Sequence, residues 1–394
     1  MWWQLFCKEM KYYLKSITYY IFIVAVVIFY SSQMTFPKSI DDIKPLTREE
    51  ITEKVNKMPV EQREYIKARL EHAYGTKPMT DIKMKQKTMY NYMDMNLEEK
   101  VLEVYKFGFA KRVKLSDKQV DAFKAAMEKI SPEKQVSEEE FIDALNDLDK
   151  ILGGGSYYGE KLRENILKTS ITYEEALEDF NIKLKEDKIT NAEGRVFADY
   201  MGITAGIFPM FIAAFILIRD MKSGAQEVIF SKKTSSLKYV LTKYLAAIAS
   251  LMVPYAITAT HGTLTYARLA ANSGIAIDNF AFYKYMVLWI IPTLMFVTAV
   301  GMLFGVIFRK PIAAIVIQFL LRFSSITNLY GSYGLDKYII RFNSSVNNVE
   351  YMKWANSVQI NRTFYFLLSL VIIFIAVFLY DRRRGSLGEK FSLL

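Results

Sequence analysis

The stretch YMVLWIIPTLMFVTAVGMLFGVIF, from Tyr285 to Phe308, contains no charged residue. It is longer than the ~20 apolar residues that a helix needs to cross the hydrocarbon core of a bilayer. We therefore predict a transmembrane helix here. The whole chain of 394 residues is 52% hydrophobic and 14% aromatic, which is too apolar for one soluble domain. The composition thus indicates a membrane protein.

Five further stretches meet the same criterion. The six predicted spans run approximately over residues 17–34, 197–218, 239–260, 285–308, 311–329 and 363–380. Acidic and basic residues nearly balance in the block 35–198 between the first two spans, so the excess of Lys and Arg lies beside the apolar stretches. Because the positive-inside rule produces this distribution, we attribute the net charge of +10 to membrane topology and expect no nucleic-acid partner.

The basic residues also set the expected orientation. With the N-terminus in the cytoplasm, the cytoplasmic connections and the tail 381–394 hold most of the basic residues near spans, including Arg382 to Arg384. We therefore expect a multi-pass protein of the cell membrane with both termini in the cytoplasm. Residues 35–198 would then be extracytoplasmic, since a long domain crosses the membrane largely regardless of its charge.

The pattern of the block 35–198 is helical. Its helix start signals are Thr47 with Glu50, Ser116-Asp117, Ser131-Pro132, and Ser137 with Glu140. Apolar residues recur at helical spacing, and Val-rich alternating strands are absent. We expect a last helix that begins near Ile189 and continues through Phe197 into the second span. The predicted fold class is all-α: a six-span polytopic membrane protein with an inserted all-helical extracytoplasmic domain.

Signatures of catalysis are sparse in this sequence. The two histidines, His72 and His261, have no metal-binding spacing, and the single cysteine, Cys7, allows no intramolecular disulfide. The segment GGGSYYGEKL, Gly153 to Leu162, contains the glycine interval of a phosphate loop but lacks the Gly-Lys-Ser/Thr that contacts phosphate and magnesium. We interpret it as a flexible connection, and we expect no catalytic residue, metal or cofactor in this chain.

Methionines are concentrated in one segment of the outer block. They are Met79, Met84, Met89, Met93 and Met95, set among polar and basic residues. Methionine fills irregular gaps between helices, which is the interpretation we favour. Binding of Cu(I) by the thioethers and contact with varied peptides are the two functional alternatives.

Arg322 is a charged residue within the fifth predicted span. A charge at bilayer depth costs about 2–3 kcal/mol on insertion scales, so such a residue needs a partner or an exit to water. It would face a polar pathway, pair with Asp336 or Glu350, or extend its side chain to the outer surface. The sequence leaves these alternatives open.

The first sixteen residues combine tryptophan, phenylalanine and tyrosine with three lysines. This composition is typical of an interfacial amphipathic helix, with aromatic rings at the level of the headgroups. The alternative is a plain helical extension of the first span. We therefore assign residues 1–16 to an interfacial helix and residues 17–34 to the first span.

The connection between the second and third spans interrupts the hydropathy abruptly. It has the sequence LIRDMKSGAQEVIFSKKTSSLKYVLTKYLAAI, from Leu217 to Ile248. A charged span end is followed by Ser-Gly, a glutamate, a short apolar run, a polar turn, and a lysine at the start of the next span. This segment, 219–238, resembles the cytoplasmic coupling segment of ABC-2 type transporter permeases, here with a large extracellular domain between the first and second spans.

The resemblance implies a set of residues that couple the chain to a partner ATPase. They are Asp220, Ser223, Gly224, Glu227, Val228, Ile229, Phe230 and Lys243. The apolar residues among them would insert into a groove of the partner. The sequence departs from the family pattern at Lys232-Lys233, where many members have a small residue and proline, and at Thr242, where the family has glycine.

The resemblance also implies an assembly and an activity. Two permease halves, identical or related, join two ABC ATPase subunits that bind ATP and Mg²⁺, and membrane lipid surrounds them. An amphipathic cargo such as a peptide or bacteriocin, a drug or a lipid-like molecule is exported. The connection 331–361 would dip into the outer leaflet. The alternative function is a transporter-like sensor or scaffold whose outer domain binds a ligand and signals without transport.

Overall fold

Two compact units make up the chain. Residues Met1–Lys44 and Asp179–Leu394 form the first, and Pro45–Glu178 form the second. The computed structural model describes residues 2–59, 73–106, 109–222, 234–326 and 333–392. Most of these residues are helical, which confirms the predicted all-α class of the chain as a whole.

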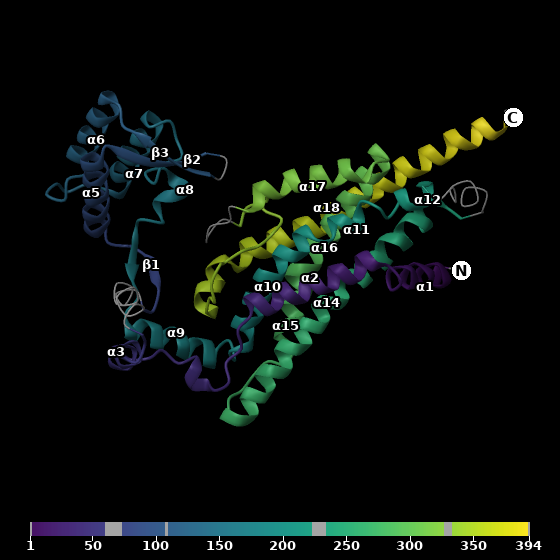
Figure 1. Cartoon of the computed structure of the whole chain (residues 1–394), viewed down its shortest axis with the longest axis horizontal. Coiled ribbons are helices and arrows are strands. Elements are labelled where there is room, and N and C mark those ends of the chain that lie inside the picture. The colour runs from purple at the N-terminus through teal and green to yellow at the C-terminus, as the bar shows by residue number, and fades with distance from the viewer. Residues whose placement is uncertain (1, 60–72, 107–108, 223–233, 327–332, 393–394) are drawn as a thin grey trace. The chain divides into compact units, whose positions relative to one another are not determined.

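The first unit is a bundle of helices, and the boundary between the units falls within α9 (Tyr173–Lys185). The other elements of this unit are α1 (Trp2–Tyr13), α2 (Ile17–Gln33), η1 (Ile40–Asp42), α10 (Thr190–Ile207), α11 (Met210–Ala213), α12 (Ile218–Lys222), α14 (Ser236–Ser273), α15 (Ala281–Tyr285), η3 (Met286–Ile290), α16 (Ile291–Phe308), α17 (Pro311–Ile326) and α18 (Asn348–Ser392). In Figure 1, α1, α12 and the C-terminal part of α18 lie at the same end of this bundle.

Four helical stretches among the described residues are long and apolar enough to cross a membrane: Thr190–Asp220, Ser236–Ser273, Ala281–Phe308 and Asn348–Arg384. Together α1 and α2 form a fifth candidate. The apolar part of α17, Pro311–Leu320, is shorter, and residues 327–332 after it lie outside the described residues. A polytopic membrane protein is therefore confirmed, and the sixth span stays a prediction.

Helix α1 is not a plain extension of α2. The two helices meet at an angle of 69°, and Ser16 between them has the extended backbone (φ −88°, ψ 125°) of a residue that precedes a helix. Helix α1 packs along α14. The alternative of one continuous helix is therefore wrong, whereas the interfacial position of α1 stays a prediction.

Pro209 interrupts the second candidate span. Helix α10 begins at Thr190, as expected, and ends at Ile207, shortly before Pro209 opens the single turn α11. Proline lacks the N–H that would continue the helical ladder, and its ring restricts the residue before it. The chain turns again at 214–217 before α12. This interruption places Arg219 and Asp220 on a short helix of their own.

The second unit contains the helices α3 (Arg48–Asn56), α5 (Ile82–Glu99), α6 (Asp117–Lys129), α7 (Glu138–Ile151) and α8 (Glu160–Arg163). The predicted starts of α3, α6 and α7 are confirmed, because capping boxes join Thr47 with Glu50, Ser116 with Gln119, and Ser137 with Glu140. The start predicted at Ser131-Pro132 is wrong, since α7 begins only at Glu138. Pro132 lies in a turn instead.

Two short antiparallel sheets also belong to the second unit, so the expectation of an all-helical domain missed them. Strand β2 (Val101–Lys106) pairs with β3 (Phe109–Lys114), with Val101 opposite Lys114. Strand β1 (Thr76–Pro78) pairs with β4 (Lys168–Ser170). On β2 the side chains of Leu102 and Val104 are buried, which gives the strand an inner face.

Methionine contributes to the core of the second unit. Met89 and Met93 on α5 are fully buried and belong to the same hydrophobic cluster as Phe123. This matches the gap-filling interpretation for these two residues. Met84 and Met95 are about half exposed, and the copper and peptide alternatives stay predictions.

The glycine segment between α7 and α8 is an ordered turn, not a flexible connection. Gly153, Gly154 and Gly155 all have positive φ, from 77° to 89°. The Asp149 carboxylate fastens the turn by accepting hydrogen bonds from the backbone N–H and the hydroxyl of Ser156, at 2.9 and 2.6 Å. The turn thus has a structural role in which glycine is required by conformation.

Two neighbouring substitutions test this role. Both Gly154→Ala and Gly155→Ala strain a positive φ, which costs about 1 kcal/mol. A Cβ at Gly155 would also lie 2.3 Å from the carbonyl oxygen of Tyr105 on β2, whereas one at Gly154 meets nothing within 4 Å. We expect Gly155→Ala to lower the free energy of unfolding by about 2 kcal/mol more than Gly154→Ala. Equal losses in denaturant titrations would contradict this assignment.

The capping box at α7 predicts a pH dependence. Hydrogen bonds from the backbone N–H and hydroxyl of Ser137 lower the pKa of the Glu140 carboxyl below its usual value. A lowered pKa stabilises the fold above the unfolded-state pKa, and this contribution is lost as the pH falls through the folded value. We expect Glu140→Gln to lower the melting temperature at about pH 7, and to have a progressively smaller effect as the pH falls toward about 3. Melting curves with the same difference at both pH values would exclude this role.

Candidate functional site

Two of the predicted coupling residues meet in the structure. Asp220 lies on α12 and Lys243 lies in the second turn of α14, and the Lys243 Nζ is 2.9 Å from Asp220 Oδ2. The other predicted residues, Ser223, Gly224, Glu227, Val228, Ile229 and Phe230, lie in 223–233, outside the described residues. Asp220 and Lys243 thus stand on the two helices that flank this segment.

Two further charged residues complete the arrangement. Lys243 Nζ also lies 3.0 Å from Glu9 Oε1 on α1. Arg219 Nη2 lies 2.8 Å from Glu9 Oε2, and Arg219 Nε lies 3.2 Å from Asp220 Oδ1. Each cation therefore contacts both anions, and each anion contacts both cations. We call Glu9, Arg219, Asp220 and Lys243 the charge ring.

The charge ring is largely removed from solvent. Lys243 is fully buried and Glu9 is only 6% exposed, while Arg219 and Asp220 are partly buried. Buried charges are tolerated only when they are paired and hydrogen-bonded. Because the ring contains two positive and two negative side chains, its formal charge is zero. Removal of any one member would leave an unbalanced buried charge.

Neighbouring side chains hold the ring in place. The Tyr239 hydroxyl on α14 donates a hydrogen bond to Asp220, and the Arg219 guanidinium lies over the ring of Tyr12 with 3.7 Å to its centroid. The Trp2 indole N–H donates to the Thr242 hydroxyl. Thr242 thus supplies an acceptor that ties the start of α1 to α14.

This geometry joins α1, α12 and α14 through charges rather than through apolar contact alone. The segment 223–233 connects α12 to α14, and both of these helices contribute a residue to the ring. Ion pairs and hydrogen bonds in a low-dielectric interior depend steeply on geometry. The charge ring therefore fixes α1, α12 and α14 to one another at this end of the bundle.

Glu9 is the member of the ring that sequence reasoning missed. A signal for it exists, because Glu9 is the only acidic residue before Asp41 and lies among lysines and aromatic residues. An isolated acid in a basic, apolar segment is expected to have a specific partner. Its partners lie more than two hundred residues away in sequence, so the pairing itself required the structure.

A second set of buried charges lies along α10. Arg195 Nη2 is 2.7 Å from Asp187 Oδ1 and donates to the Val346 carbonyl at 2.7 Å, and Arg195 Nη1 donates to the Tyr285 hydroxyl at 2.9 Å. Its guanidinium also lies over the ring of Tyr351, 4.8 Å from the centroid. One side chain thus joins α10 to α15, to α18 and to the segment that precedes α18.

The segment 333–347 between α17 and α18 is held inside the bundle. The Asp199 carboxylate on α10 accepts from Arg341 and from the backbone N–H of Asn343 at 3.0 Å. Arg362 on α18 donates to the carbonyls of Trp289, at the π-helical turn η3, and of Tyr338, at 3.2 and 3.0 Å. These contacts give the segment a defined path, and its insertion into the outer leaflet stays a prediction.

Three other residues that the sequence singled out are Arg322, His72 and His261. Arg322 lies on α17, but its side chain is outside the described residues. His72 also lies outside them, and His261 Nδ1 is 2.9 Å from the Tyr30 hydroxyl. In the described ranges there is no group of three or more His, Cys, Asp or Glu residues that could hold a metal ion. The charge ring is therefore the strongest candidate site that the geometry offers.

Comparisons with known proteins give one match. No curated protein and no solved structure matches the chain. The family model described as "ABC-2 family transporter protein" matches residues 65–380, which is well over half of the sequence. This family consists of the membrane permeases of ABC transporters, which associate with an ABC ATPase. The chain belongs to the ABC-2 family of transporter permeases.

Proposed function

We propose that this permease exports an amphipathic cargo, such as a peptide, a drug or a lipid-like molecule, when two separate ATPase subunits bind and hydrolyse ATP with Mg²⁺. The observation that supports this mechanism most directly is the charge ring at the two ends of the segment 223–233. An ATPase that docks on this segment would act on α12 and α14 at the same time. The ring would carry that motion to α1.

The residues of the segment have distinct proposed roles. Val228, Ile229 and Phe230 insert into a groove of the ATPase, while Ser223, Gly224 and Glu227 complete the docking segment. Asp220 and Lys243 transmit the movement through the ring. This division separates contact with the partner from transmission into the bundle, so the two can be impaired separately.

The proposed topology has both termini in the cytoplasm and residues 35–198 outside the cell. The common position of α1, α12 and the end of α18 in Figure 1 supports one side for both termini. Basic residues gather there as well, including Arg382, Arg383 and Arg384 on α18. Anionic lipid and the positive-inside rule favour the cytoplasmic side for such a cluster.

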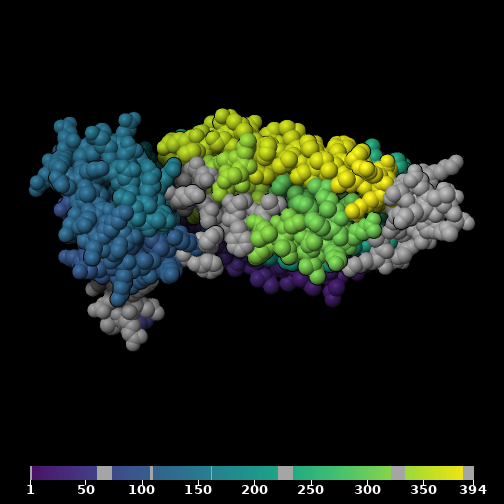
Figure 2. Space-filling model, turned by 90° about the horizontal axis from the view of Figure 1, so that it is seen from above, coloured from purple at the N-terminus to yellow at the C-terminus, as the bar shows by residue number. Residues whose placement is uncertain are grey.

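The proposed assembly contains two permease halves. Figure 2 shows α17 (green) and α18 (yellow) on one face of the first unit. The span in α18 is only 28% buried, against 61–78% for the other long spans. Its exposed apolar residues include Phe366, Leu367, Val371, Phe374 and Phe378. Lipid and a second permease half, identical or related, would both cover such a face.

The double substitution of Gly224 and Glu227 by leucine and alanine tests the docking step. We expect it to abolish cargo transport into proteoliposomes and to weaken co-purification with the ATPase, because it alters the docking segment without changing a residue of the charge ring. Lys232→Gln, at a position where the sequence departs from the family pattern, serves as the control and should retain transport. Normal transport by the double variant would refute the mechanism.

The sensor or scaffold alternative gives a different result in the same system. A sensor would show a ligand-dependent change in a signalling partner, with no flux of any cargo under ATP turnover. ATP-dependent flux that requires Glu227 supports the exporter. Absence of flux together with such a signal would instead identify the protein as a sensor.

A further inference from the structure

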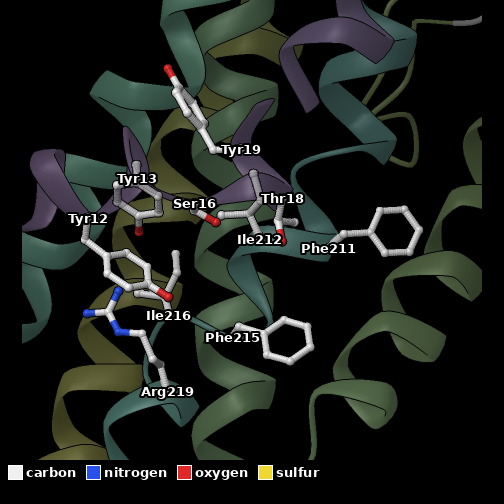
Figure 3. A pocket seen from close by; sticks show the side chains of 10 residues that line it. All are labelled: Tyr12, Tyr13, Ser16, Thr18, Tyr19, Phe211, Ile212, Phe215, Ile216 and Arg219. Carbon is white, nitrogen blue, oxygen red and sulfur yellow. The ribbon is translucent and has the colours of Figure 1, made fainter. Parts of the chain in front are cut away.

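A cavity of about 440 Å³ lies at the bend between α1 and α2. One wall is apolar and comes from α11 and the turn after it, with Phe211, Ile212, Phe215 and Ile216. The opposite wall comes from α1, the bend and the start of α2. Figure 3 shows the two phenylalanine rings on one side of the cavity and the bend on the other. The cavity therefore has two chemically different sides.

The wall from the bend is rich in hydroxyl groups. It contains Tyr12, Tyr13, Ser16 and Thr18, whereas the hydroxyl of Tyr19 turns away and donates to the Ser250 carbonyl at 2.8 Å. Tyr13 is only 3% exposed, and its hydroxyl has no hydrogen-bond partner among the described residues. A buried hydroxyl without a partner is unfavourable. A ligand that offers an acceptor would satisfy it.

The charges that line the cavity further restrict which chemical groups can bind there. Arg219 lines the cavity, but its charge is already balanced within the charge ring by Glu9 and Asp220. The site therefore does not demand a free anion. It favours a group with several oxygen acceptors that can lie beside a neutralised guanidinium, as phosphodiester and ester oxygens do.

Next to the cavity, α2 presents an apolar surface. Ile17, Ile21, Val24 and Ile28 on α2 are all more than half exposed. A surface of this kind on a membrane helix contacts acyl chains. The hydroxyl-rich wall lies at the bend, where α2 gives way to the aromatic and basic α1, and this pattern is typical of the headgroup region.

We propose that this cavity binds one glycerophospholipid from the leaflet next to α1. The lipid's phosphate and glycerol ester oxygens accept hydrogen bonds from the hydroxyls of Tyr13, Ser16 and Thr18. Its acyl chains follow the phenylalanine wall and the exposed face of α2. Because Arg219 belongs to both the cavity and the charge ring, the bound lipid lies directly beside the anchor of α1, α12 and α14.

Substitutions that fill the cavity provide the main test. The full-length protein is reconstituted in nanodiscs of phosphatidylethanolamine and phosphatidylglycerol. It is then released from the nanodiscs, and native mass spectrometry measures the lipid that stays bound to it. We expect wild type to retain one phospholipid per chain and Thr18→Trp to retain about tenfold less, since the indole occupies the space of the headgroup. Leu264→Trp, at an exposed apolar position on α14 that does not line the cavity, should retain as much as wild type.

Removal of a single hydroxyl tests the polar wall. Tyr13→Phe should weaken retention about fivefold, the effect of one lost hydrogen bond. Tyr283→Phe, whose hydroxyl pairs with Thr260 away from the cavity, is the matched control and should have no effect. Diacylglycerol, which lacks the phosphate, should not displace the phospholipid.

Three results would overturn the proposal: unchanged retention by Thr18→Trp, equal losses in Thr18→Trp and Leu264→Trp, or displacement by diacylglycerol. The first two would indicate nonspecific surrounding lipid, and the third an apolar ligand. The measurement uses neither cargo nor ATPase. Its failure is therefore distinguishable from failure of the proposed export function.

Discussion

Lys243→Met is expected to lower the free energy of unfolding by about 3–5 kcal/mol, because it breaks a buried charge network by removing one partner. Lys243 is fully buried and contacts both Glu9 and Asp220. Without it, Arg219 alone faces two carboxylates, one of them on a different helix. Denaturant titration of the purified permease in detergent measures the loss.

The control for this variant is Lys11→Met, which removes the same charge from an exposed position on α1. Its effect should stay within about 0.5 kcal/mol, as for surface substitutions in general. The double variant Glu9→Gln/Lys243→Met should be less destabilised than the sum of its single changes, because the remaining pair is balanced. A Lys243→Met protein as stable as Lys11→Met would show that the ring contributes nothing.

Arg195→Met is the second substitution with a large expected effect. Arg195 and Asp187 have side chains that are only 3% and 1% exposed, and the same guanidinium holds the carbonyl of Val346. Removal of Arg195 leaves Asp187 as an uncompensated buried charge and releases the segment before α18. We expect a loss of about 3–5 kcal/mol, measured by the same titration.

A charge-conserving change separates the two roles of Arg195. Arg195→Lys keeps the positive charge but not the planar fork that reaches several partners, so its loss should be intermediate. Lys353→Met is the exposed comparison, since Lys353 and Glu350 form a pair on the surface of α18. That pair is worth about 0.3–0.5 kcal/mol. Equal effects of Arg195→Met and Lys353→Met would contradict the structural role of Arg195.

Hydropathy was sufficient to predict the long apolar helices but not to predict where they are interrupted. The stretch 285–308 was predicted as one span, and it contains the π-helical turn η3 directly before α16. That turn accepts a hydrogen bond from Arg362, more than seventy residues later in the chain. Window averages of hydrophobicity do not contain such a contact. Contacts with such distant partners therefore require the three-dimensional structure.

Local signals predicted the helix starts of the second unit well, and its strands poorly. The capping boxes at Thr47 and Ser137 depend on residues three positions apart, so the sequence contains the complete interaction. The pairing of Thr76 with Ser170 joins strands almost a hundred residues apart. Short strands of three residues have no periodicity that a sequence window can detect.

The candidate site was only partly accessible from sequence. The resemblance of 219–238 to a coupling segment identified Asp220 and Lys243, because both belong to a local pattern around one connection. Glu9 was missed because its role arises from the packing of α1 against α14. The hydroxyl wall of the lipid cavity depends on the 69° bend in the same region. Both features come from long-range packing at one end of the bundle.

We propose that the charge ring transmits movement of the docked ATPase to α1. The chain contains one cysteine, Cys7, which lies on α1 and is partly buried. The rate at which a maleimide labels Cys7 in complex with a cysteine-free ATPase, with and without ATP, follows this movement without any knowledge of the cargo. ATP should change the labelling rate in wild type, and this response should disappear in Glu9→Gln/Lys243→Met although the complex still assembles. An unchanged response to ATP in that assembled double variant would contradict transmission through the charge ring.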